Sequence, residues 1–178
     1  HPDKLAAYNT LRELARPYPQ VAEAHWVVAQ AAEAAARHDV ALDEARKARA
    51  VRPEWDMGAL LEAQLLLREA PQQALAVLKK YLGDYPDANE VRLFYARALL
   101  EQRQYPESRV EFQKLQKLHP DNAELALAIA LLSLQMGELD RAEQELQKSL
   151  RAGKKDNATV YYYLAQLNEA RNNNEVAL

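Results

Sequence analysis

Cysteine is absent from this chain of 178 residues, and glycine is scarce, at 4 residues. The lack of cysteine excludes disulfides, thiolate nucleophiles and zinc sites built on thiolates. It is equally compatible with a reducing cytosol and with an oxidising periplasm. With only 4 glycines and 8 prolines, the chain also falls outside the fibrous and low-complexity classes.

A strong net charge and a long apolar run are missing as well. The 23 basic and 26 acidic residues give a net charge of -3, so there is no global positive field to attract a phosphate backbone. We therefore predict no nucleic-acid partner. No stretch approaches the roughly 20 consecutive apolar residues that a membrane helix needs. The first residues also lack the layout of a secretion signal.

Side chains arranged for catalysis or ligand binding are not apparent in the sequence. The histidines have no metal-ligand spacing, the serines have no glycine-flanked elbow, and the glycines are too dispersed to hold a phosphate. We therefore predict a protein that is not an enzyme, with no metal, no cofactor and no small-molecule substrate. The histidines in question are His1, His25, His38 and His119.

Prolines recur at a nearly fixed stride. Pro19, Pro53, Pro86 and Pro120 stand 34, 33 and 34 residues apart, each just after an apolar stretch with helical spacing. A period of about 34 residues is typical of helix-turn-helix arrays, whose units are too small to bury their apolar faces without stacked neighbours. Because 49% of the residues are hydrophobic and 28% are charged, we predict an ordered all-α solenoid of stacked antiparallel helix pairs.

Small residues fall in register with this stride. They lie twelve residues before each proline, or at the matching place, and a seam-filling residue follows four positions later. That spacing places both on one helical face and lets two helices approach closely, which marks the second helix of each unit. The small residues are Ala7, Ala41, Ala74, Ser108 and Ala142, and the followers are Leu11, Ala45, Leu78, Phe112 and Leu146.

In two repeats the start of the first helix has the spacing of a capping box. The residues are Asp87 and Glu90 in one repeat and Asp121 and Glu124 in the next. The whole frame predicts a single array over 1–178 that begins in mid-unit, so we expect the true N-terminus to lie upstream. Its parts are a lone second helix at 3–16, full repeats at 22–54, 55–88, 89–122 and 123–157, and a partial fifth repeat at 158–178.

The residues in this frame resemble the tetratricopeptide repeat family. Four copies in register cover nearly the whole chain, and the match in the third full repeat includes Tyr95, Ala96, Tyr105, Phe112 and Pro120. The resemblance implies a right-handed superhelical α-solenoid whose first helices line a concave groove that receives extended or helical segments of partners. Glu62 departs from the pattern, because the family has Gly or Ala there. We expect its repeat either to pack more loosely or to turn the carboxylate outward.

The resemblance also implies which residues line the groove. Trp26 is either a partner anchor or a cover for the helix at 3–16, and among three successive tyrosines Tyr162 alone is expected to face the groove. A family carboxylate clamp of Lys and Asn is absent. Apolar groove residues flanked by acids favour a partner helix with apolar anchors and a basic flank. The groove residues are Trp26, Gln30, Glu33, Ala63, Leu93, Arg97, Leu100, Leu127, Leu131, Tyr162 and Gln166.

Basic residues on the second helices, such as Arg46 and Arg49, are interpreted as a solvated outer face. The function implied is a noncatalytic scaffold or adaptor for a protein or peptide. The overall composition resembles bacterial cell-envelope proteins of this family, several of them outer-membrane lipoproteins that scaffold periplasmic proteases and cell-wall hydrolases. This likeness implies recruitment of such an enzyme in the periplasm or at the outer membrane, with membrane attachment only through a missing lipid anchor. The alternative is a cytoplasmic scaffold that self-associates through apolar ends such as Leu5, Leu14, Val176 and Leu178.

Overall fold

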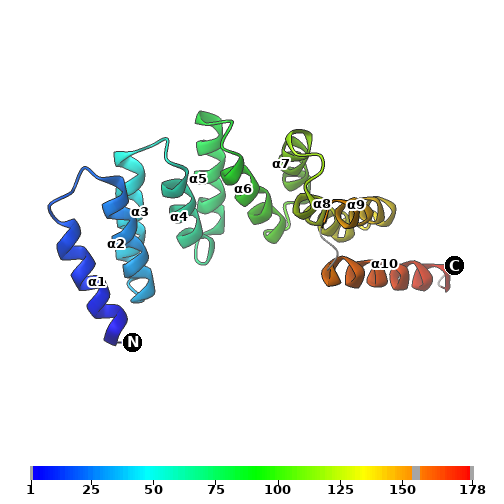
Figure 1. Cartoon of the computed structure of the whole chain (residues 1–178), viewed down its shortest axis with the longest axis horizontal. Coiled ribbons are helices and arrows are strands. Elements are labelled where there is room, and N and C mark those ends of the chain that lie inside the picture. Colours follow the sequence, from blue (N-terminus) through cyan, green and yellow to red (C-terminus); the bar gives the residue numbers. More distant parts are fainter. Residues whose placement is uncertain (1, 154–156, 177–178) are drawn as a thin grey trace. The chain divides into compact units, whose positions relative to one another are not determined.

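The computed structural model describes residues 2–153 and 157–176. Ten α-helices and no strand occur within these ranges, which confirms the all-α prediction (Figure 1). Expected linker residues 154–156, the terminal residues His1 and Leu178, and the side chain of Val176 lie outside what is described. The helices are α1 (Pro2–Ala15), α2 (Ala22–Ala34), α3 (His38–Val51), α4 (Asp56–Leu67), α5 (Pro71–Asp84), α6 (Asn89–Glu101), α7 (Tyr105–Leu118), α8 (Ala123–Gln135), α9 (Leu139–Ala152) and α10 (Ala158–Val176).

The chain forms two compact units, residues 1–94 and 95–178, and α6 crosses the boundary between them. In the first unit α2 pairs with α3 and α4 with α5, while α1 packs on α2 and α3 packs on α4. In the second unit α8 pairs with α9, α7 packs on α8, and α10 packs on α9. Each full repeat expected from the proline stride therefore contains two helices. Whether the units form one continuous array stays a prediction.

The small residues of the second helices are buried as their spacing predicts. Ala41, Ala74, Ser108 and Ala142 are all 0% exposed. Ala142 packs in a cluster with Ala130, and the other small residues lie at the same place in their pairs, so helix backbones approach closely. Four residues further on, every follower in these pairs is also fully buried: Ala45, Leu78, Phe112 and Leu146.

The register differs in α1, where Ala7 is exposed and Tyr8, only 2% exposed, packs against Val28 and Ala32 instead. In the later pairs the small residue packs against the first helix of its own pair. No described helix precedes α1 in that role, so the side of α1 that carries Ala7 is uncovered.

Three turns inside helix pairs share one backbone motif. Ala36, Arg103 and Gly137 have φ values of 57°, 58° and 73°. In each turn the next residue's amide bonds a carbonyl five residues back, as Gln104 does with Leu99 at 2.9 Å. This is the left-handed ending that glycine favours, and a side chain there costs roughly 1 kcal/mol. Ala36 and Arg103 bear that cost.

Asn122, and not Asp121, caps α8. The helix begins at Ala123, and the Asn122 side chain accepts a hydrogen bond from the Leu125 amide at 2.9 Å. The capping-box spacing therefore located the start of this helix but placed the cap one residue early.

Substituting Asn122→Ala is expected to lower the free energy of unfolding by about 1 kcal/mol, because the Leu125 amide loses its acceptor. Urea unfolding followed by circular dichroism measures this change. The matched control is Asp121→Ala, for which we expect a change within about 0.5 kcal/mol. A larger effect at Asp121 than at Asn122 would contradict the assignment of the cap.

Glu62 follows neither alternative expected from the sequence. Its side chain is 3% exposed, and it lies between two arginines of α3. Glu62 Oε1 is 3.3 Å from Arg46 Nε, and Glu62 Oε2 is 2.8 Å from Arg49 Nε. The second contact is an ion pair without hydrogen-bond geometry, since Oε2 has no hydrogen-bond partner. The carboxylate is thus buried and neutralised, and it is neither loosely packed nor turned outward.

Candidate partner-binding site

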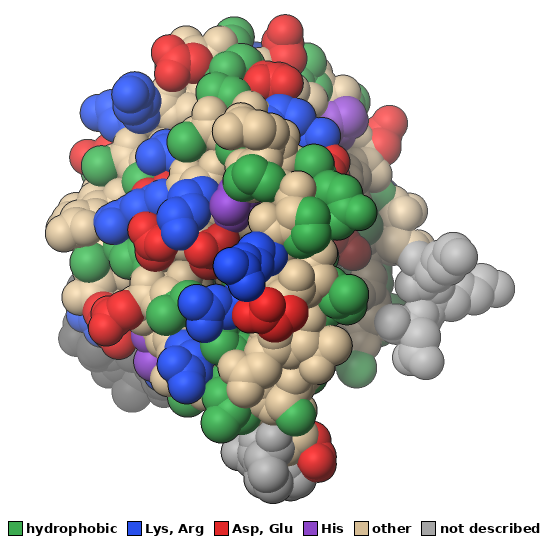
Figure 2. Space-filling model, turned by 90° about the vertical axis from the view of Figure 1, so that its left-hand side faces the viewer, with side chains coloured by type: hydrophobic (Ala, Val, Ile, Leu, Met, Phe, Trp, Pro, Cys, Tyr) green, Lys and Arg blue, Asp and Glu red, His purple; other side chains and the backbone are tan. Residues whose placement is uncertain are grey.

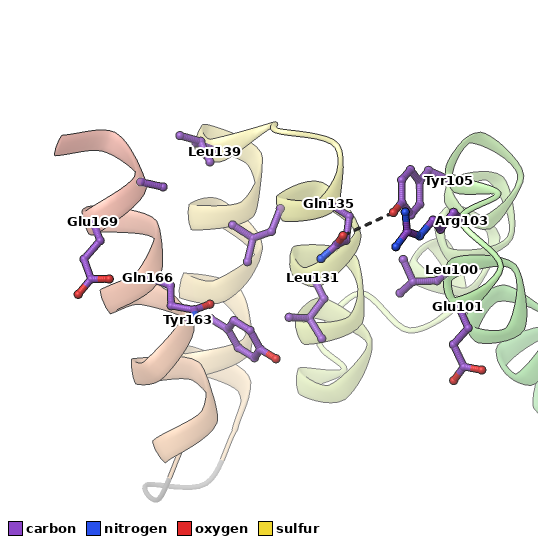
Figure 3. Close-up of a pocket in the computed structure, with 12 residues that line it drawn as sticks. Leu100, Glu101, Arg103, Tyr105, Leu131, Gln135, Leu139, Tyr163, Gln166 and Glu169 are labelled. Carbon is purple, nitrogen blue, oxygen red and sulfur yellow. Dashed lines mark hydrogen bonds between the residues drawn. The ribbon is translucent and has the colours of Figure 1, made fainter. Parts of the chain in front are cut away.

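The second unit contains a cavity of about 680 Å³ (Figure 3). Three of the residues expected in the groove lie in its wall: Leu100 on α6, Leu131 on α8 and Gln166 on α10. Arg97, Leu127 and Tyr162 belong to the same unit but do not line it. The lining residues are Leu100, Glu101, Arg103, Tyr105, Leu131, Leu134, Gln135, Leu139, Tyr163, Gln166, Glu169 and Ala170.

The floor of this cavity is apolar and its sides carry amides. Half-buried leucines from α6, α8 and α9 form the floor. The Tyr105 hydroxyl donates to Gln135 Oε1 at 3.4 Å (Figure 3). Gln166 Nε2 donates to the Tyr162 hydroxyl at 2.7 Å. These bonds occupy the oxygen of one amide and the nitrogen of the other. Gln135 thus keeps a free donor and Gln166 a free acceptor for the backbone of a bound segment.

Charged side chains stand at both ends of the cavity. Glu101 on α6 and Glu169 on α10 are exposed, and neither forms an ion pair with any residue that the structure describes (Figure 3). Arg103 is likewise exposed and has no partner in the described ranges. Two carboxylates and one guanidinium give the rim a net negative charge.

Arg103 is a cavity residue that the sequence analysis missed. It occupies the left-handed turn position that Gly137 occupies 34 residues later. A long charged side chain at a position suited to glycine is a signal that a comparison of the repeats can detect. The signal is not specific, because Ala36 has the same backbone and lines none of the cavities described.

Tyr163 lines the cavity, whereas Tyr162, which we expected to face the groove, does not line it. Tyr162 is 58% exposed, and its ring meets the Tyr163 ring edge-on at 5.3 Å between centroids. Successive helical residues point about 100° apart, so a shift of one position exchanges the inward residue. No proline precedes α10 at the expected stride. The position of the inward-pointing tyrosine on α10 could therefore be predicted only to within one residue.

In the first unit, Trp26 of α2 packs against Ala29, Ala45 and Leu61. Its ring lies 6.1 Å from the ring of Trp55, tilted by 54°. Trp55 is the residue that immediately precedes α4, and the sequence analysis did not single it out. Trp26 is half-buried, so part of its ring stays accessible.

Arg52 covers another part of Trp55. Its guanidinium carbon lies 4.4 Å from the ring centroid, and Arg52 Nη1 donates to Glu23 Oε1 at 2.6 Å. A hydrogen bond from its own backbone, aided by the bond from Arg52, lowers the pKa of the Glu23 carboxyl. The charges beside the tryptophan pair are therefore satisfied internally.

The remaining predicted residues of the first unit differ in accessibility. Gln30 is exposed, and Glu33 is paired with His38 Nδ1 at 2.6 Å and with Arg68 Nη1 at 3.4 Å. Leu93 is half-buried. Ala63 is 0% exposed, so it contributes packing and no accessible surface, contrary to its expected place in the groove. The structure thus brings Trp26, Gln30 and Glu33 together on one face of α2 but excludes Ala63 from the surface.

Other kinds of site are not indicated in the part of the chain that the structure describes. In that part no group of three or more acidic or histidine side chains is placed to bind a metal ion. Nor does any helix there combine the length and apolar character needed to cross a bilayer. The face seen in Figure 2 carries basic and acidic side chains interspersed with apolar ones. Its chemistry is that of a mixed protein surface.

A model of the family described as tetratricopeptide repeat matches residues 65–131 and 104–167. Similar solved structures include a tetratricopeptide repeat protein of Thermus thermophilus, 22% identical over 92% of this chain and 90% of that chain, with a TM-score of 0.67. MamA from Desulfovibrio magneticus is 15% identical over 88% of each chain, with a TM-score of 0.73.

A third similar structure is YrrB, a tetratricopeptide repeat protein with an unusual peptide-binding site. It is 14% identical over 92% of this chain and 84% of that chain, with a TM-score of 0.69. No curated protein matches the chain. At these identities the likeness establishes the fold, and it confirms the expected helical-repeat solenoid.

Proposed function

The chain belongs to the tetratricopeptide repeat family of protein-interaction scaffolds, and we propose that its second unit binds a segment of a partner polypeptide in the cavity lined by α6, α8 and α10. The observation that carries this proposal is the combination within one cavity of a leucine floor, two side-chain amides and unpaired charges at the rim. Apolar anchors supply affinity in such grooves, and amides fix the backbone of the bound segment.

The rim favours a particular partner chemistry. Glu101 and Glu169 lie on the two outer helices of the cavity and have no cation of their own in the described part of the chain. A segment with leucine-like or aromatic anchors between basic residues would pair with both carboxylates. The similar structure YrrB is described as having an unusual peptide-binding site, which supports a peptide as the class of ligand.

The test is selection of peptides from a random displayed library against the intact chain, followed by affinity measurement. We expect the selected peptides to share apolar residues flanked by Lys or Arg. Leu131→Arg should weaken the best peptide by about 30-fold or more, which corresponds to a loss of about 2 kcal/mol at a central anchor.

The matched control is Leu118→Arg, at a 59% exposed leucine of α7 that does not line the cavity. It should leave the affinity unchanged, and both variants should keep the helical circular-dichroism spectrum. Equal weakening by both variants would overturn the proposed site. Selected peptides without a bias towards basic residues would overturn the proposed charge preference.

The cellular setting is a separate proposal. We propose a scaffold of the bacterial periplasm or outer membrane that recruits an envelope protease or cell-wall enzyme, supported only by the chain's composition. Fractionation of cells that express the full-length protein tests this setting, and recovery in the cytosol would contradict it. Light scattering at high concentration tests the alternative of a self-associating scaffold, because that alternative requires a mass that rises with concentration.

A further inference from the structure

A second cavity, of about 230 Å³, lies in the first unit and has different chemistry. It is lined on α3 by Arg46, Arg49 and Ala50 and on α5 by Lys80, with Pro53 and Tyr85 beside them. All these elements belong to the second helices of their pairs or to the loops that follow. The cavity is therefore built from other residues than the proposed peptide site, and the proposed function makes no use of it.

The buried carboxylate of Glu62 orients the two arginines of this cavity. Glu62 lies 3.3 Å from Arg46 Nε and 2.8 Å from Arg49 Nε. Because it contacts each guanidinium through Nε, the four terminal Nη groups are not used by it. No other residue in the described ranges accepts a hydrogen bond from either guanidinium. Two arginine forks are thus held by a side chain that is only 3% exposed, while their terminal donors stay free.

The tyrosines of the wall are also fixed. The Tyr81 hydroxyl lies 2.6 Å from Asp56 Oδ1 and 2.7 Å from the Glu54 carbonyl oxygen, so its proton is already engaged. Burial and the bond to Asp56 raise the pKa of Tyr81, which keeps that proton in place. The Tyr81 and Tyr85 rings pack at 4.7 Å between centroids, which positions Tyr85 at the cavity.

We propose that this cavity binds an oxyanion carried by a partner polypeptide, either a phosphoryl group or a carboxylate, through the Nη groups of Arg46 and Arg49 and the ammonium of Lys80. Arginine pairs bind both anions in a bidentate manner, and a guanidinium held in place loses little entropy on binding. Lys80 is exposed and has no partner among the described residues. Asp84 lines the cavity and Glu62 contacts its two arginines, so these two acids leave a net positive charge for the ligand.

This assignment revises the sequence interpretation of Arg46 and Arg49 as a solvated face. A solvated face needs no buried counter-charge, since exposed arginines are neutralised by water and mobile ions. Here the chain buries a carboxylate at a position where the repeat family has Gly or Ala. The burial costs stability unless the arginines are present, and it fixes their geometry.

The first experiment titrates inorganic phosphate into the intact chain at constant ionic strength, with chloride as the reference. Arginine Nε–Hε resonances observed by NMR are the readout. We expect saturable shifts at Arg46 and Arg49 with phosphate and not with chloride. Shifts that rise linearly with phosphate without saturation would overturn the proposal.

Two variants test the donors. Lys80→Gln should weaken phosphate binding by about 5-fold or more through loss of a charged donor. Lys79→Gln removes the same charge from the neighbouring exposed position, which does not line the cavity, and should have little effect. Equal weakening by both variants would mean that only the general positive field of α5 acts, and this would overturn the site.

Glu62→Gln separates preorganisation from net charge. The substitution makes the cavity more positive, so a purely electrostatic attraction would tighten phosphate binding. If Glu62 orients the arginines, binding weakens despite the added positive charge, and this is the result we expect. Tighter binding would overturn the role of Glu62 as an orienting residue.

The source of the oxyanion is decided by two peptides of one sequence, which carry either phosphoserine or glutamate at the same position. Binding of either peptide that is lost in Lys80→Gln supports a ligand on a partner polypeptide and identifies its anion. Binding of free phosphate without binding of either peptide would overturn the polypeptide as the carrier.

Discussion

Phe112→Ala is expected to lower the free energy of unfolding by about 3–5 kcal/mol, among the largest costs of any single substitution in this chain. Phe112 is 0% exposed and is the largest fully buried side chain among the described residues. It lies one turn after Ser108, whose hydroxyl donates to the Ala96 carbonyl at 2.8 Å and so fixes α7 against α6. Removing the ring leaves a cavity that these fixed backbones cannot close.

The measurement is urea unfolding followed by circular dichroism, with Val110→Ala as the control on the same helix. Val110 is 49% exposed, so its truncation should change the free energy of unfolding by no more than about 0.5 kcal/mol. A repeat array is stable only through its neighbours, and we therefore expect the Phe112 variant also to loosen α8, which packs on α7. A cost at Phe112 as small as that at Val110 would contradict its place in the core.

The helix pairs could be predicted because their determinants are local and repeated. Proline at a fixed stride follows α3, α5 and α7 and prevents these helices from continuing, and a small residue at a fixed distance before it allows close packing. Ala41, Ala74, Ser108 and Ala142 are fully buried for this reason. In α1 no described helix precedes the one that carries Ala7, and there the same spacing predicted burial of Ala7 although Tyr8 is the buried residue.

The cavity of the second unit could be predicted only in part. Leu100, Leu131 and Gln166 follow from the pattern of first helices, which repeats along the sequence. Arg103 lies in a turn, where the family pattern assigns no groove residue. Tyr163 was missed because no proline carries the frame across the linker before α10. These errors come from positions where a one-residue shift or a turn decides which way a side chain points.

Glu62 illustrates a limit of a different kind. The sequence places this carboxylate at a repeat position suited to a small residue, but it does not identify the side chains that the carboxylate contacts. Arg46 lies 16 residues earlier on α3, and its approach to Glu62 depends on how α3 packs against α4. The two helices are close at this point, since a Cβ at Gly58 would lie 3.4 Å from the Arg49 Cα, at van der Waals contact. Pairing between helices is a tertiary property that a single sequence leaves open.

The consequence of this pairing is an asymmetric response to mutation. The double variant Arg46→Gln with Arg49→Gln is expected to lower the free energy of unfolding by about 3 kcal/mol, because it leaves a buried carboxylate without a counter-charge. Glu62→Gln should cost far less. Its amide fills the same volume, and the arginine side chains, 52% and 31% exposed, can be solvated.

The triple variant, with all three residues changed to Gln, should recover most of the stability that the double variant loses, since no buried charge is then left unpaired. Urea unfolding of the parent, the double variant, Glu62→Gln and the triple variant completes the comparison. If the double and triple variants are equally unstable, the arginines stabilise the fold by packing their side chains and not by neutralising Glu62. If the triple variant is nearly as stable as the parent, the charged cluster adds little net stability, and its retention is better explained by binding than by folding.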